Sequence, residues 1–398
     1  VVTYSGDRLN ITAGALWFRS KDIAGGPDGM QNTFSFASGI IPASGKVFLG
    51  NEGRYFNKAT SMAAYLQAEY KRTEQLELVV GGGITKDKKS SRFEWDSLAG
   101  VIVPRPDIVP PVYKKSKPNW LVGLNYKPSE DVLVYGKAST SFVSGGSVAG
   151  IAFKPETALS FELGFKADML DRRLRANVAV FHVDYKNFQQ PSSTTSTEAV
   201  AFLNAVYGAL GTALSRNLST FVQQAHDVRA KGIEAELTAA PADGVTLGGS
   251  VSYTDVSFRN ISAVFLAANQ GEYEVFARPK WTGSAFAAYE TPPIAGDTTV
   301  NFRLDGLYRS YFLFSSTPQL RLAQGVPKQY LGSPGHWKFN GRVAVKNISL
   351  GGVDAELALW GRNLTDKRYA SSNIFLSQGV PLEFEQGRSW GLDFGIEF

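Results

Sequence analysis

The chain of 398 residues contains no cysteine. In an oxidising compartment its stability therefore cannot come from disulfides, and must come from a large core or a closed ladder of backbone hydrogen bonds. No apolar run reaches the roughly 18 residues that a transmembrane helix needs, which excludes a helical membrane protein. The opening residues, VVTYSGDRLN, also lack the charged and apolar regions of a signal peptide.

Other functional signals are missing as well. The net charge is +5, but no run of Lys and Arg is interleaved with stacking aromatics, so we predict no nucleic-acid partner. The three histidines, His182, His226 and His336, lie in separate segments without ligand spacing, so we predict no metal site. No nucleophile, histidine and acid can be assembled into a catalytic set. We therefore predict no catalytic residue and no cofactor.

What the chain does contain is 12% aromatic residues, 40 glycines and a repeated two-residue hydrophobic period. In Val300 to Tyr308 the apolar residues alternate with polar ones, which predicts a β-strand with one apolar and one polar face. The same alternation recurs in 337–345 and 353–362. Charged residues in these three strands all fall on the polar side. We expect six of them to face a watery lumen, namely Arg303, Asp305, Lys338, Arg342, Asp354 and Glu356.

The connections between the predicted strands alternate in length. Short turns at 71–74, 127–131 and 349–352 alternate with long polar segments, among them 21–60 and 86–118. Transmembrane barrels have short periplasmic turns and long extracellular loops in this order. We therefore predict an all-β fold, a transmembrane antiparallel β-barrel, with about fourteen strands in this chain. Aromatics at strand ends, such as Tyr253 and Trp337, suit interfacial girdles, with core packing in a soluble fold as the alternative.

Four stretches resemble one family. GRNLTDKRY at 361–369 is similar to the C-terminal signature of TonB-dependent outer-membrane receptors. The stretches at 135–146 (YGKASTSFVSGG), 154–187 and 231–254 resemble the same family in the expected order. The resemblance implies a barrel of about 22 strands with a plugged lumen. Residues 1–398 would then be the C-terminal portion of the barrel, with the N-terminal plug domain and the first strands absent. A self-contained barrel of about fourteen strands is the alternative.

The last eleven residues, RSWGLDFGIEF, alternate in the same way and end on an aromatic. Such a terminal strand resembles the signal that outer-membrane proteins present to the barrel insertion machinery. Trp390, Phe394 and Phe398 carry this resemblance, whereas Ile396 stands where a second aromatic is common.

The function implied by the resemblance is TonB-energised uptake of a scarce nutrient across the bacterial outer membrane. A ferric siderophore is the default ligand, with cobalamin, an oligosaccharide or another metal chelate as alternatives, and TonB would contact the missing N-terminal region. The other expected partner is outer-membrane lipid. A passive porin-like channel and an outer-membrane enzyme remain as alternatives. The loop after residue 309 combines aromatics with a cation, a mixture that can stack on and neutralise an anionic chelate, although ordinary loop packing would use it too. The candidate ligand residues are Tyr311, Phe312, Phe314, Arg321 and Tyr330.

Overall fold

The computed structural model describes residues 1–24, 53–96, 102–104, 112–148, 151–193, 201, 203–206, 208, 220–373 and 380–397. Phe398 of the predicted insertion signal lies outside these residues. No helix among the described residues is long and apolar enough to cross a bilayer.

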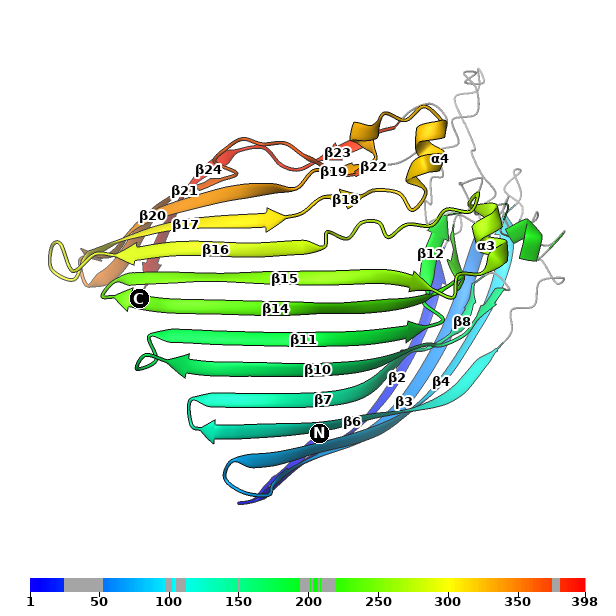
Figure 1. Cartoon of the computed structure of the whole chain (residues 1–398), viewed down its shortest axis with the longest axis horizontal. Helices are drawn as coiled ribbons and strands as arrows, with labels where there is room; N and C mark the ends of the chain where they lie inside the picture. Colours follow the sequence, from blue (N-terminus) through cyan, green and yellow to red (C-terminus); the bar gives the residue numbers. More distant parts are fainter. Residues whose placement is uncertain are drawn as a thin grey trace.

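Over the described residues, one antiparallel sheet of 16 strands forms the main structure (Figure 1). All strands but one follow each other along one path, in chain order. They are β1 (Val2–Ser5), β2 (Leu9–Ala24), β3 (Gly53–Lys71), β4 (Leu76–Asp96), β6 (Tyr113–Ser129), β7 (Val132–Val143), β10 (Glu156–Met169), β11 (Leu174–Lys186), β14 (Asp227–Ala242), β15 (Val245–Arg259), β16 (Trp281–Glu290), β17 (Thr299–Arg309), β20 (His336–Leu350), β21 (Val353–Arg362) and β24 (Ser389–Glu397). The sixteenth, β5 (Ile102–Pro104), pairs with β4.

The two ends of this sheet differ. Tight turns, such as 72–75 and 351–352, join the strands at one end, which is the left end in Figure 1. The longer connections at the other end carry α3 (Ala263–Ala268), α4 (Pro318–Ala323), the 3₁₀ turn η1 (Lys328–Tyr330) and four small hairpins. The hairpins are β8–β9 (Gly146–Val148 and Ile151–Phe153), β12–β13 (Gln190–Ser193 and Thr220–Gln223), β18–β19 (Phe312–Leu313 and Gly332–Ser333) and β22–β23 (Ala370–Asn373 and Leu382–Phe384). The predicted antiparallel all-β fold with alternating short and long connections is confirmed.

Strand register sorts the side chains into two faces. Phe302 lies opposite Val343, which lies opposite Leu359 on the next strand. Arg303, one residue along from Phe302, lies opposite Arg342. Because successive side chains point to opposite faces of a sheet, each apolar row is backed by a polar row. We call the face that carries Phe302 the apolar face, and the one that carries Arg303 the polar face.

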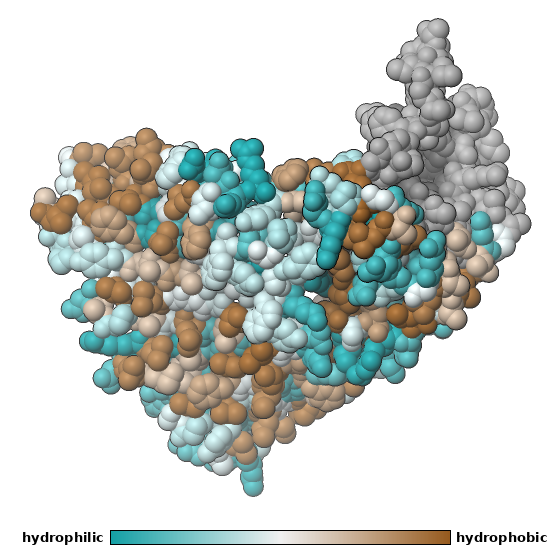
Figure 2. Space-filling model, turned by 45° about the horizontal axis from the view of Figure 1, so that its top comes forward, coloured by the Kyte–Doolittle hydropathy of each residue, from teal (hydrophilic) through white to brown (hydrophobic). Residues whose placement is uncertain are grey.

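The apolar face has no second sheet packed against it in the described part of the chain. Many of its large side chains remain open, among them Val343 at 41% exposed and Leu392 at 72%. Figure 2 shows hydrophobic side chains exposed on the surface of the sheet. In a soluble sandwich these rows would be buried between two sheets. The exposed apolar rows therefore identify a surface that needs a non-aqueous environment.

Several strands are longer than the hydrophobic pattern predicts. The hydrophobic pattern predicts loops at 21–60 and 86–118, but β2 continues to Ala24, β4 runs on to Asp96 and β6 begins at Tyr113. These loop boundaries are wrong for a physical reason. Beyond the hydrocarbon layer a strand keeps its backbone hydrogen bonds but no longer needs apolar side chains on one face, so hydropathy stops marking it.

Candidate functional site at the long-loop rim of the polar face

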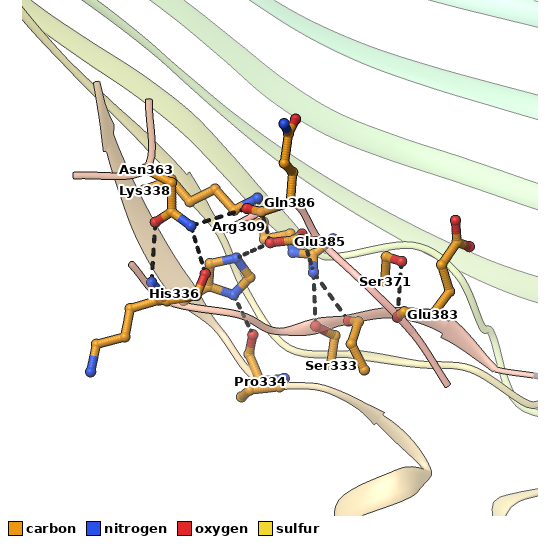
Figure 3. A network of polar contacts seen from close by, with 12 residues as sticks. Arg309, Ser333, Pro334, His336, Lys338, Asn363, Ser371, Glu383, Glu385 and Gln386 are labelled. Carbon is orange, nitrogen blue, oxygen red and sulfur yellow. Dashed lines mark hydrogen bonds and ion pairs between the residues drawn. The ribbon is translucent and has the colours of Figure 1, made fainter. Parts of the chain in front are cut away.

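A cluster of charged side chains lies where β17 ends and β20 begins. Arg309 lies opposite His336 in the ladder, and Lys338 is two residues further along β20, so all three occupy the polar face. Glu385, from the segment between β23 and β24, reaches into this group of cations (Figure 3). We call these four residues the rim cluster.

One carboxylate holds the rim cluster together. Oε1 of Glu385 lies 2.7 Å from Nη2 of Arg309, and Oε2 lies 2.5 Å from Nζ of Lys338 and 3.3 Å from Nε2 of His336. The contacts to Oε2 are within ion-pair distance but lack hydrogen-bond geometry. The Glu385 side chain is only 13% exposed. Two permanent cations therefore share one shielded carboxylate, which leaves excess positive charge at this rim.

Further contacts fix the orientation of the cations. Arg309 donates from Nη2 to Oγ of Ser333 at 2.8 Å, and its guanidinium lies 4.8 Å from the ring centre of Phe312. Nδ1 of His336 lies 2.9 Å from the carbonyl oxygen of Pro334, and since a carbonyl only accepts, Nδ1 carries a hydrogen. The His336 ring also stacks on Tyr369 with centroids 3.7 Å apart.

Asn363 anchors the segment that carries Glu385. Its backbone N–H donates to Oδ1 of Asn340 on β20, and its side-chain amide donates to the carbonyls of Lys367 and Gln386 at 2.8 and 3.1 Å (Figure 3). The backbone of Asn363 is left-handed, with φ of 48°. Asparagine tolerates this conformation better than most residues, so it can end β21 and still hold both arms of the following segment.

The structure divides the five predicted ligand residues into two kinds. Tyr311 is 53% exposed beside the rim cluster, whereas Phe312 is 8% exposed and packs edge-on against Phe314 at 5.5 Å. Arg321 lies on α4 and donates to Gln324 at 2.9 Å. Tyr330 lies in η1, where its carbonyl accepts a hydrogen bond from Asn373. Phe312 serves loop packing, and Tyr311 presents the most accessible aromatic surface of the five.

Ion pairs run along the polar face below the rim. Arg303 donates hydrogen bonds to both carboxylate oxygens of Asp305. Arg342 on β20 forms an ion pair with Glu356 on the adjacent strand β21. Lys338 belongs to the rim cluster, and Asp354 lies opposite Glu397 near the short-turn end. The six residues predicted to face a lumen thus fall on one face or at its end. That this face lines a water-filled lumen stays a prediction.

An aromatic cluster with a buried histidine lies at the same rim. His226 is 4% exposed, and its ring centroid lies 4.4 Å from Phe258 and 5.1 Å from Tyr273. Phe265 of α3 and Phe188 complete the enclosure. Neither ring nitrogen of His226 has a hydrogen-bond partner among the residues that the structure describes, and burial lowers the pKa of the imidazole to about 4. This histidine is therefore neutral at pH 7 and acts as part of a small core.

This core is expected to loosen in acid. The pKa of His226 is about 4 in the folded protein and near 6.5 when exposed, so its stabilising contribution is complete above pH 6.5 and is lost as the pH falls toward 4. Between pH 7.5 and 5 we expect a local loss of about 2 kcal/mol, which lowers the protection factors of the amides, the intrinsic exchange rate divided by the observed rate, roughly 30-fold. Hydrogen exchange over residues 224–273 measures it. His226→Phe should abolish the pH dependence of the protection factors, and His182→Gln should leave it. Equal protection factors at both pH values would contradict this interpretation.

Sequence reasoning placed Lys338 on the polar face but missed Arg309, His336 and Glu385. Arg309 and His336 could have been found by extending the two-residue period of β17 and β20 to the strand ends. Glu385 lies in an irregular segment, where no period marks it. Among the described residues, no group of three or more His, Asp or Glu side chains could hold a metal ion.

The sheet, which we call the wall, is similar to the barrels of known receptors. A family model described as "TonB dependent receptor-like, beta-barrel" matches residues 2–364. The metal-pseudopaline receptor CntO of Pseudomonas aeruginosa is 26% identical over 171 residues, which is 42% of this chain and 20% of that protein. The ferric yersiniabactin uptake receptor FyuA of Yersinia pestis superposes with a TM-score of 0.67 at 14% identity, over 100% of this chain and 56% of that one. The ferric preacinetobactin receptor BauA of Acinetobacter baumannii superposes with a TM-score of 0.65 at 14% identity, over 100% of this chain and 52% of that one. The chain thus spans about half the length of these solved receptors.

Proposed function

Because the chain belongs to the family of TonB-dependent receptor-like β-barrels, we propose that it forms part of the wall of a receptor that takes up a scarce metal chelate with energy from TonB. The match confirms the predicted family, and proteins of this family lie in the outer membrane of Gram-negative bacteria, as the sequence predicted. The family and its solved relatives are receptors and transporters, so we assign the chain no catalytic role.

The rest of the barrel is part of this proposal. Within the described residues, β1 and β24 end the strand path without pairing with each other. An open sheet edge in hydrocarbon leaves backbone groups unsatisfied at a cost of several kcal/mol each. We propose that further strands lie between β24 and β1 and close the wall into a barrel, and that an N-terminal plug fills the lumen of this barrel. The share of the solved receptors that the chain covers supports this. TonB would act on that plug.

The observation that carries the ligand assignment is the excess positive charge of the rim cluster. Arg309 and Lys338 share Glu385 on the polar face at the long-loop end, where an incoming ligand first meets the wall. Arg and Lys in a shielded site favour an anion, and the exposed ring of Tyr311 offers a surface for stacking. An anionic ferric siderophore combines both properties. The names of FyuA and BauA as ferric siderophore receptors support this ligand class. Phe314, Arg321 and Tyr330 remain secondary candidates for contact.

Uptake of a radioactive ferric siderophore by cells that produce the whole receptor tests this function. We expect uptake to stop when the proton-motive force is collapsed or TonB is deleted. Uptake that continues unchanged would instead indicate a passive porin-like channel. In the same cells, Tyr311→Ala should weaken binding of the siderophore about tenfold, since stacking of one aromatic is worth roughly 1 kcal/mol or more.

A further inference from the structure

The apolar face carries an unexpected set of cations near its long-loop end. Strand register places these residues on the same face as the exposed apolar rows of β2, β3, β4 and β6, and all of them are exposed. The set, which we call the outer basic patch, consists of Arg19, Lys21, Lys58, Lys86, Lys88 and Lys114.

Two pairs within the outer basic patch oppose each other directly. Lys21 lies opposite Lys58, and Lys88 lies opposite Lys114. Like charges directly opposite one another destabilise a sheet. Such an arrangement is unfavourable, and an anion held by both lysines of a pair would relieve it.

In the described part of these four strands, no carboxylate on the same face neutralises the patch. Over residues 17–23, 56–62, 84–92 and 114–120, no position of the apolar-face register holds Asp or Glu, and none of the six cations is paired with another described residue. Further along the strand path, beyond β7 and β10, the strands β11, β14 and β15 behave differently. There Arg229 lies 2.8 Å from Asp184, and Lys231 and Lys280 lie 3.8 and 3.5 Å from Asp255. The same end of the same wall therefore contains a neutralised sector and an uncompensated one.

The position of the patch specifies the kind of anion. On successive strands, the last large apolar residues before the cations are Trp17, Met62, Ile84 and Trp120, which are 62%, 52%, 55% and 44% exposed. Aromatic and apolar residues of this kind mark the boundary between hydrocarbon and headgroups. The cations follow within two to six residues along each strand, at about 3.3 Å per residue. They therefore lie at headgroup level in the leaflet next to the long loops. The four adjacent strands present them over a width of roughly 14 Å.

We propose that the outer basic patch binds the phosphate groups of an anionic lipid in the leaflet that faces the long loops. The lysine ammonium groups ion-pair with the headgroup phosphates, while the acyl chains lie along the apolar rows below. Bound phosphate relieves the repulsion between the opposed lysines. The neutralised sector of β11 to β15 does not share this site.

The test uses the whole receptor, purified in mild detergent, and a diphosphorylated lipopolysaccharide as the probe. Lipid retention is measured by native mass spectrometry. The variant Lys86→Gln, Lys88→Gln, Lys114→Gln is expected to retain at least about tenfold less lipopolysaccharide than the wild type, since each lysine near an anionic surface contributes separately. Dephosphorylated lipopolysaccharide should bind the wild type and this variant equally.

The same two strands supply a matched control. Lys89, Lys115 and Lys117 lie at nearly the same height on β4 and β6 but belong to the polar-face register. Replacing these three lysines with Gln changes the net charge by the same amount, and we expect lipid retention within about twofold of wild type. Equal losses in both variants would show that only overall charge matters and would overturn the proposal. So would retention that is unaffected by the outer-face substitutions, or displacement of the lipid by millimolar inorganic phosphate.

Discussion

Leu304→Arg is expected to destabilise the folded wall by about 2–4 kcal/mol in a bilayer, the cost of a guanidinium that faces lipid at mid-depth. Leu304 lies at the centre of β17 on the apolar face, opposite Ala287 and Gly341, and is 51% exposed. Its neighbours are too small to cover a charge. The measurement is the urea dependence of unfolding of the whole receptor in lipid vesicles, with midpoint and slope determined for each variant.

Leu307 provides the control for this prediction. It lies three residues along the same strand, is 48% exposed and occupies the polar face opposite Ser284 and Lys338. Leu307→Arg places the same charge in a wet, screened environment, where repulsion from Lys338 should cost less than about 1 kcal/mol. If the two variants lost equal stability, the two faces would not differ in environment, and the assignment of apolar and polar faces would be wrong.

Glu385→Gln is expected to release the segment between β21 and β24 from the wall. The substitution keeps the shape of the side chain but removes the one carboxylate among the described residues that Arg309 and Lys338 share. Breaking a buried charge pair costs about 3–5 kcal/mol, and the partial exposure of the two cations, 23% and 25%, reduces this to roughly 2–3 kcal/mol. Amide exchange over residues 363–388 should therefore become roughly 30- to 100-fold faster.

Glu383 is the matched control for this experiment. It lies two residues before Glu385, is exposed and accepts a hydrogen bond from Oγ of Ser372 at 2.8 Å. Glu383→Gln should change the free energy of local opening, as measured by amide exchange, by less than about 0.5 kcal/mol, as is usual for exposed charges. Unchanged exchange in Glu385→Gln would mean that Asn363 and the strand ends alone hold the segment.

The two-faced wall could be predicted because its physical cause is local. A strand in a bilayer needs an apolar side chain at every second position, and this requirement is visible in Val300 to Tyr308 without knowledge of any neighbour. Strand pairing then adds that Phe302 lies opposite Val343 and Arg303 opposite Arg342. The count of about fourteen strands is close to the strand path observed, whereas the total of about 22 stays a prediction.

Strand ends and the rim cluster could not be predicted in the same way. Lys86 and Lys88 look like loop residues because they interrupt the apolar pattern, yet they continue β4. Glu385 lies 76 positions after Arg309 in a segment without periodicity, so only the fold brings them to 2.7 Å. Phe312 looked like a ligand residue because aromatics in loops suit binding, but most of its surface is covered.

The absence of cysteine from this chain allows a direct measurement of the central claim, that each wall strand has one face in lipid and the other in water. Single cysteines at successive positions from 300 to 308, each carrying a nitroxide spin label, report collision with oxygen, which concentrates in lipid, and with a water-soluble nickel chelate. We expect the labels at 300, 302, 304 and 308 to favour oxygen, and those at 301, 303, 305 and 307 to favour nickel. A profile without a two-residue period, or with its phase reversed, would contradict the account.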